Sequence, residues 1–201
     1  QLAWVQLLGW TAVTPAQLDL IAGLLGGSTE LDGLAVDTEL RWALLRRLAA
    51  TGRADAAAID AEAARDATDA GIRHAAACRA AMPEAGRKAE AWRQLVDSEE
   101  LGIEGMMAVA GGFAQPEHID LLRPYAERYF EVLPGLWSAR ADVYRRILGA
   151  AIFPHYAASP ELLARLDAFL AAEERDPALV RLLVEHRDMV ERALRARSLP
   201  Q

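Results

Sequence analysis

The sequence has one cysteine, one lysine and no asparagine. The single cysteine, Cys78, excludes an internal disulfide and favours a reducing compartment, so we expect a cytoplasmic protein. Val, Ile and Thr together number only 23 of the 201 residues, which argues against a large sheet. No apolar run approaches the roughly 20 residues needed to span a bilayer, so no membrane partner is expected. The scarcity of Lys and Asn, whose codons are rich in A and T, indicates a genome of high GC content.

What is abundant favours helices. The chain contains 42 Ala and 29 Leu, and hydrophobic residues make up 53% of it. Ala, Leu and Arg lose little conformational freedom in a helix, so this composition predicts a helix-rich, packed domain. The formal net charge is −7, and no basic stripe interrupts the acidic balance. The sequence therefore gives no reason to expect a nucleic-acid partner.

Caps, breaks and apolar spacing divide the chain into about ten short helices. Thr14, Pro15 and Gln17 form a capping box, and Asp37 caps the next apolar stripe, from which Arg47 is expected to point away. No convincing strand occurs, so the fold class is all-α, an array of antiparallel helices resembling an α-solenoid or curved superhelix. The predicted helices span residues 15–25, 38–50, 55–66, 68–81, 84–96, 101–110, 116–132, 136–152, 161–172 and 177–197.

One soft boundary interrupts an otherwise continuous domain. Gly111, Gly112 and Phe113 predict a break between two helices, and Pro116 starts the next one. Pro124 predicts a kink or a split in that next helix. No linker-like stretch divides the chain, so residues 1–201 are interpreted as one domain. Because the chain opens with Gln1 rather than Met, we expect it to be excised from a longer polypeptide.

The histidines offer no complete metal site. His74 and Cys78 are four residues apart and reach the same side of a helix, but no third ligand accompanies them. They are therefore interpreted as a packing cysteine beside a polar histidine. His186 lies on an apolar stripe, where it is either a buried general base or, as we favour, an interior histidine with one hydrogen bond.

Several segments spread along the chain resemble one protein family. They are residues 37–42 and 49–52, the run 112–116, the run 121–130, the Phe153-Pro154 stop and residues 183–188. These segments, in this order, are similar to the C-terminal helical domain of aminopeptidase N-type zinc metallopeptidases, in particular their actinobacterial branch.

The resemblance implies a function that composition does not reveal. In that family the C-terminal domain is an array of short helices similar to HEAT-type repeats. It closes over a separate catalytic domain and bounds a cavity that admits peptides whose N-terminal residue is removed. The zinc motif His-Glu-x-x-His and the Gly-x-Met-Glu-Asn motif belong to the other domain, and neither occurs here. The resemblance thus implies a non-catalytic cap without its own metal or cofactor, whose partners are its own catalytic domain and the peptide.

Three residues are candidates for the wall of such a cavity: Arg41, Gln115 and Tyr129. The alternative interpretations are a surface ion pair for Arg41 and a core position for Tyr129. Two other functional classes stay open, a free-standing α-solenoid that scaffolds protein partners and an all-α ligand-sensing regulatory domain. Separation from a catalytic domain would bare an apolar surface, so we also expect the isolated chain to self-associate.

Overall fold

The computed structural model describes residues 1–98, 100–172 and 175–198. These residues form eleven α-helices and two short 3₁₀-helices without any strand, which confirms the all-α fold class. Within the same residues no helix is long and apolar enough to cross a membrane. The chain separates into two compact units, unit 1 (Gln1–Gln115) and unit 2 (Pro116–Gln201). The division falls at the end of the soft stretch that the sequence predicts.

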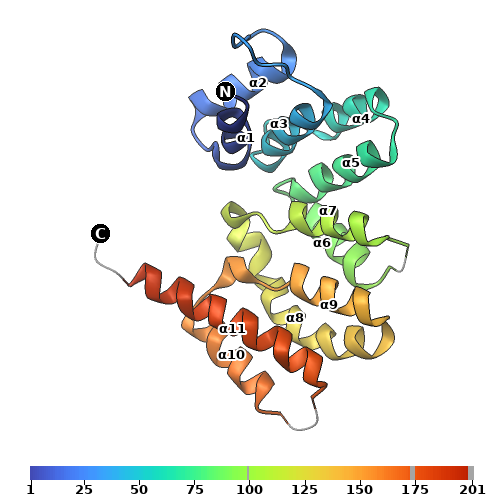
Figure 1. The fold of residues 1–201 in the computed structure, drawn as a ribbon, viewed down its shortest axis with the longest axis vertical. Coiled ribbons are helices and arrows are strands. Elements are labelled where there is room, and N and C mark those ends of the chain that lie inside the picture. Colours follow the sequence, from blue (N-terminus) through green and yellow to red (C-terminus); the bar gives the residue numbers. More distant parts are fainter. Residues whose placement is uncertain (99, 173–174, 199–201) are drawn as a thin grey trace. The chain divides into compact units, whose positions relative to one another are not determined.

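In unit 1 the residues that the structure describes form seven α-helices. Alternate helices form a row in which α1 packs on α3, α3 on α5, and α5 on α7, while α2 and α6 pack beside neighbouring members of the row and α4 beside α5 (Figure 1). A row of alternate helices, each packed on the next, is typical of an α-solenoid. The bounds are α1 Leu2–Thr11, α2 Pro15–Gly26, α3 Thr38–Ala50, α4 Ala56–Arg65, α5 Asp69–Ala81, α6 Ala85–Val96 and α7 Ile103–Phe113.

The starts of α2 and α3 follow the side-chain caps that the sequence predicts. The Thr14 hydroxyl accepts a hydrogen bond from the backbone N–H of Gln17, and the Gln17 side chain accepts one from the Thr14 backbone, completing the capping box. Asp37 accepts from the backbone N–H of Leu40 at 2.9 Å. Both caps are confirmed, and they fix where the chain enters α2 and α3.

The predicted break at Gly111 and Gly112 is wrong, because both residues continue α7. A Cβ atom at Gly112 would lie 2.2 Å from the backbone oxygen of Ala77 on α5. The glycine therefore serves close packing between two helices and does not form a turn. The chain leaves the helix at Ala114 instead.

Two further expectations for unit 1 need correction. Helix α1 is absent from the predicted set because its apolar residues lie on both faces and produce no single stripe. Arg47 is buried instead of pointing away from the core, and its Nε donates to the backbone oxygen of Ala12 at 2.6 Å. This bond satisfies a carbonyl just after the end of α1 that would otherwise be buried without a donor.

The only lysine of the chain lies in the interior of unit 1. Lys88 on α6 is fully buried, and its Nζ donates to the backbone oxygens of Ala80 at 2.7 Å and Phe113 at 3.1 Å. These oxygens belong to the last turns of α5 and α7, where carbonyls lack partners within their helix. The ammonium therefore stabilises two helix C-termini at once.

The described residues of unit 2 form four α-helices and two 3₁₀ turns. Helix α8 packs on α9, α9 on α11, and α10 on α11, which lies beside it in Figure 1. The bounds are η1 Pro116–His118, α8 Ile119–Ala139, α9 Asp142–Ala151, η2 His155–Ala157, α10 Pro160–Leu170 and α11 Pro177–Arg197.

Helix α8 corrects the predicted division into helices at residues 116–132 and 136–152. It begins after the η1 turn, runs through Pro124 and Pro134, and ends at Ala139. Both prolines are exposed, while the buried stripe from Leu122 to Trp137 continues past them. Burial of this stripe outweighs the backbone hydrogen bonds that the two prolines cannot donate.

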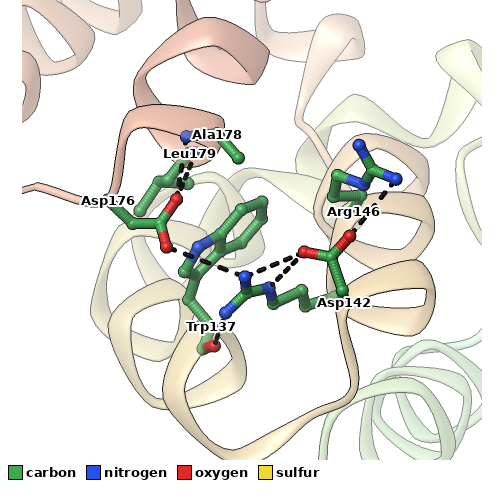
Figure 2. A network of polar contacts seen from close by, with 7 residues as sticks. Trp137, Asp142, Arg146, Asp176, Ala178 and Leu179 are labelled. Carbon is green, nitrogen blue, oxygen red and sulfur yellow. Dashed lines mark hydrogen bonds and ion pairs between the residues drawn. The ribbon is translucent and has the colours of Figure 1, made fainter.

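A polar network ties the helix ends of unit 2 together (Figure 2). The Arg145 guanidinium donates to the backbone oxygen of Trp137 at 3.0 Å, and it pairs with Asp142 at 2.8 Å and Asp176 at 3.7 Å. Asp176 also caps α11 by accepting from the backbone N–H of Ala178 at 2.8 Å. Arg145 thus joins the end of α8 to the starts of α9 and α11.

Candidate functional site

Arg41 is held by groups from two neighbouring helices of unit 1. Its Nε donates to Oε1 of Glu62 at 2.7 Å and its Nη2 to Oε2 at 2.6 Å, which is a bidentate pair. Its Nη1 donates to the backbone oxygen of Leu25 at 2.9 Å. Because Leu25 lies on α2 and Glu62 on α4, the Arg41 side chain joins three helices.

Burial makes this ion pair stronger than one on an open surface. The Glu62 side chain is 7% exposed and that of Arg41 is 20% exposed. The hydrogen bonds from Arg41 lower the pKa of the Glu62 carboxyl, and the same bonds raise the pKa of Arg41. Removing one partner would leave the other as a poorly solvated charge. The expected surface ion pair for Arg41 is thus present but mostly buried.

Arg41 also borders an open depression with a volume of about 840 Å³. The loop between α2 and α3 forms most of its lining and contributes both acidic and apolar side chains. Arg41 and Arg65 supply the basic side chains. The depression thus offers hydrogen-bond donors, acceptors and apolar contacts within one surface. Its other lining residues are Leu24, Leu25, Gly26, Gly27, Thr29, Glu30, Leu31, Asp32, Gly33, Leu34 and Val36.

Gln115 and Tyr129 occupy different kinds of position. The Gln115 amide nitrogen donates to the backbone oxygens of Gly111 and Gly112, each at 3.0 Å, and closes the last turn of α7. The residue stays partly exposed. Tyr129 is fully buried in unit 2, where its hydroxyl donates to the backbone oxygen of Gly149 at 3.0 Å and burial raises its pKa. Tyr129 is therefore placed as a core residue.

The three candidate wall residues do not converge on a single site within either unit. Arg41 and Gln115 belong to unit 1 but share no hydrogen-bond partner, and Tyr129 belongs to unit 2. Sequence reasoning missed Glu62, because a partner 21 residues away on another helix leaves no local pattern.

The His74–Cys78 pair has the environment of packing residues. His74 stacks on Trp42 with ring centroids 5.7 Å apart, and its Nε2 lies 3.3 Å from Oε2 of Glu39. Cys78 is 1% exposed, and burial raises the pKa of its thiol to about 12, which opposes the thiolate that metal binding needs. Throughout the described ranges, no three His, Cys, Asp or Glu side chains are grouped to hold a metal ion. The His74–Cys78 pair therefore does not fit a zinc ion.

His186 lies in an aromatic environment. Its ring stacks on Phe153 with centroids 4.2 Å apart, and the His155 ring lies 4.9 Å away. The residue is 5% exposed, and neither ring nitrogen has a hydrogen-bond partner in the described structure. The expected single hydrogen bond is therefore absent. Burial, with a smaller contribution from His155, lowers the pKa of His186 to about 4.

A second depression, of about 490 Å³, lies in unit 2 between α8, η2, α10 and α11. Three arginines border it, and each has an acceptor. Arg123 pairs with Asp120, Arg165 pairs with Glu127, and Arg197 donates to the backbone oxygen of Ala158 at 2.6 Å. Two of these arginines thus pair with carboxylates, whereas the acceptor of Arg197 is a neutral carbonyl.

Comparison with known proteins identifies the family that the sequence resembles. A model of the ERAP1-like C-terminal domain family matches residues 1–192, which reach through both units. Aminopeptidase N of Streptomyces lividans is 47% identical over 198 residues, covering 98% of this chain. The chain spans only 23% of the length of that relative. The chain therefore belongs to the ERAP1-like C-terminal domain family.

Proposed function

We propose that this chain is the C-terminal helical domain of a zinc-dependent aminopeptidase and is not catalytic by itself. The observation that carries the proposal is the 47% identity to an Aminopeptidase N of which the chain corresponds to only 23%. The rest of such a protein has ample length for a catalytic domain. Under this proposal the zinc ion and the residues that cleave the peptide belong to that other part. In the part of the chain that the structure describes, no three His, Cys, Asp or Glu side chains are grouped to hold a metal ion.

The proposed role is to close the cavity that holds the peptide and to contact the peptide away from its N-terminus. Arg41 is suited to such contact because three hydrogen bonds leave two of its five guanidinium N–H groups available beside the depression. Gln115 offers a partly exposed carboxamide at the end of α7. Tyr129 is committed to the core of unit 2, so we confine the wall role to Arg41 and Gln115.

The separation of this chain from catalysis has a direct test. Residues 1–201 alone should bind no stoichiometric zinc and should not hydrolyse an aminoacyl anilide, since they lack a metal-binding cluster among the described residues. Metal analysis and a chromogenic assay provide the measurements. Chelator-sensitive hydrolysis by the purified chain would contradict the proposal.

The peptide contact is tested by two substitutions that break the same ion pair in the full-length enzyme. Arg41→Gln removes the cation beside the depression, whereas Glu62→Gln keeps it. We expect Arg41→Gln to raise KM for longer peptides several-fold and to leave KM for an aminoacyl anilide unchanged. Glu62→Gln should reduce stability without that selective change. Equal effects of both variants on KM would assign Arg41 a purely structural role.

A further inference from the structure

The outward face of α1 is apolar. Trp4 is 75% exposed, Trp10 is 64% exposed, and Leu7 between them is 51% exposed. Their spacing of three residues places them on the side opposite Val5 and Gly9, which are buried, with Gly9 against α3. A helix that is apolar on all sides is normally enclosed by other helices.

The helix row of unit 1 shows that α1 has fewer packing neighbours than α3 and α5. Helix α3 lies between α1 and α5, and α5 lies between α3 and α7, so each has a row neighbour on two sides. Helix α3 accordingly buries Leu40 and Leu44 in one cluster and Trp42 and Leu45 in another. Helix α1 has the same two-sided apolar composition, but among the described residues α3 is the one row neighbour on which it packs closely.

We propose that the face of α1 formed by Trp4, Leu7 and Trp10 is covered by a helix of the polypeptide that precedes Gln1 in the full-length protein, which continues the row. This inference rests on the proposed function, under which the chain is the C-terminal part of a longer enzyme. About three quarters of the similar Aminopeptidase N lies outside the matched region.

The guanidinium of Arg46 fixes part of this face. It lies 4.2 Å from the centre of the Trp10 ring and covers one side of the indole. Burial lowers the pKa of Arg46. A ring held in this way keeps its other side available to an apolar partner with little further ordering. A second copy of this chain is the competing occupant, and the experiment below separates the two.

Tryptophan quenching tests the proposal. Of the five tryptophans, Trp42, Trp92 and Trp137 are each no more than 6% exposed, so Trp4 and Trp10 dominate accessibility to a quencher. Acrylamide quenching is compared between the wild-type sequence and the Trp4→Phe, Trp10→Phe double variant, both in residues 1–201 and in the full-length protein. The difference between the two sequences reports these two indoles alone.

We expect the difference signal to be quenched several-fold less in the monomeric full-length protein than in the dilute, monomeric chain of 201 residues. Equal quenching in both proteins would overturn the proposal. Shielding that appears only when the full-length protein dimerises, as judged by light scattering, would overturn it in favour of a second copy.

A second variant pair keeps the test independent of fluorescence. Trp4→Glu places a charge on the proposed contact, whereas Ile72→Glu places one on α5, at a residue that is 64% exposed. In the full-length protein only Trp4→Glu should accelerate limited proteolysis near α1, and equal cleavage of both variants would overturn the proposal. Zinc content and peptide hydrolysis are measured separately, so failure of the proposed function is distinguishable from failure of this contact.

Discussion

At the scale of single residues, buried charged side chains form hydrogen bonds that satisfy other buried polar groups. Lys88 and Arg47 both donate to carbonyls at or near helix ends, and Glu62 receives the two hydrogen bonds of Arg41. In each case a charged donor supplies a hydrogen bond to a buried oxygen. This bond compensates for the hydrogen bond to water that the oxygen loses on folding. His186 differs, because its ring nitrogens have no partner among the described residues.

His186 should make unit 2 sensitive to acid. Its pKa is about 4 in the folded chain against an ordinary value of 6.5, so the unfolded state binds more protons between these values. Stability is complete above about pH 6.5 and falls as pH drops toward 4, by up to about 3 kcal/mol. Urea denaturation across this range should show a smaller loss in His186→Phe.

His155→Gln serves as the companion variant to His186→Phe. Repulsion from His155 is the lesser cause of the lowered His186 pKa, so this change should recover only part of the acid stability. An unchanged pH dependence in His186→Phe would contradict the assignment.

Lys88→Met should destabilise unit 1. The variant keeps the apolar stem but removes the donor to Ala80 and Phe113, whose carbonyls are at buried helix ends. We expect a loss of about 2 kcal/mol or more in chemical denaturation. Arg87→Met, at a partly exposed neighbour, should change stability by less than about 0.5 kcal/mol. Similar losses in the two variants would show that the buried hydrogen bonds are unimportant.

At the scale of elements, small residues set how closely helices approach. The alanines of α5 and Gly112 of α7 bring the two backbones together, which no larger side chain permits. In unit 2 the controlling feature is the buried stripe of α8, which carries the helix through Pro134. Packing between elements therefore overrides the local preferences of Gly and Pro.

Adjacent glycines of α7 provide a matched pair of variants. Gly112→Ala forces a Cβ atom against the Ala77 carbonyl and should cost about 3 kcal/mol of stability. Gly111→Ala meets no atom within 4 Å and should stabilise the helix by about 0.5–1 kcal/mol. Thermal denaturation compares them, and effects of the same sign would contradict the close-approach explanation.

At the scale of the whole molecule, two compact units share one family assignment. The family match extends over residues 1–192, although packing divides the chain after Gln115. The interpretation of residues 1–201 as one domain stays a prediction. The apolar side chains Trp4, Leu7 and Trp10 of α1 stay exposed within unit 1.

The isolated chain should self-associate through α1. Trp4 and Leu7 are exposed on it, and in a separated domain another copy offers the nearest apolar surface. Analytical ultracentrifugation should show association that rises with concentration and is abolished by Trp4→Glu. Ile72→Glu, at a residue of α5 that is 64% exposed, should leave association unchanged. A monodisperse monomer at high concentration would contradict this prediction.

The helical class, the caps at Thr14 and Asp37 and the family can be read from the amino-acid order alone, because they depend on composition, short-range hydrogen bonds and short segments along the chain. The packing of Gly112 and the pairing of Arg41 with Glu62 emerge only once the helices are packed together. The tertiary structure also showed that α1 carries an uncovered face. These features depend on contacts between residues distant in sequence, for which local periodicity has no signal.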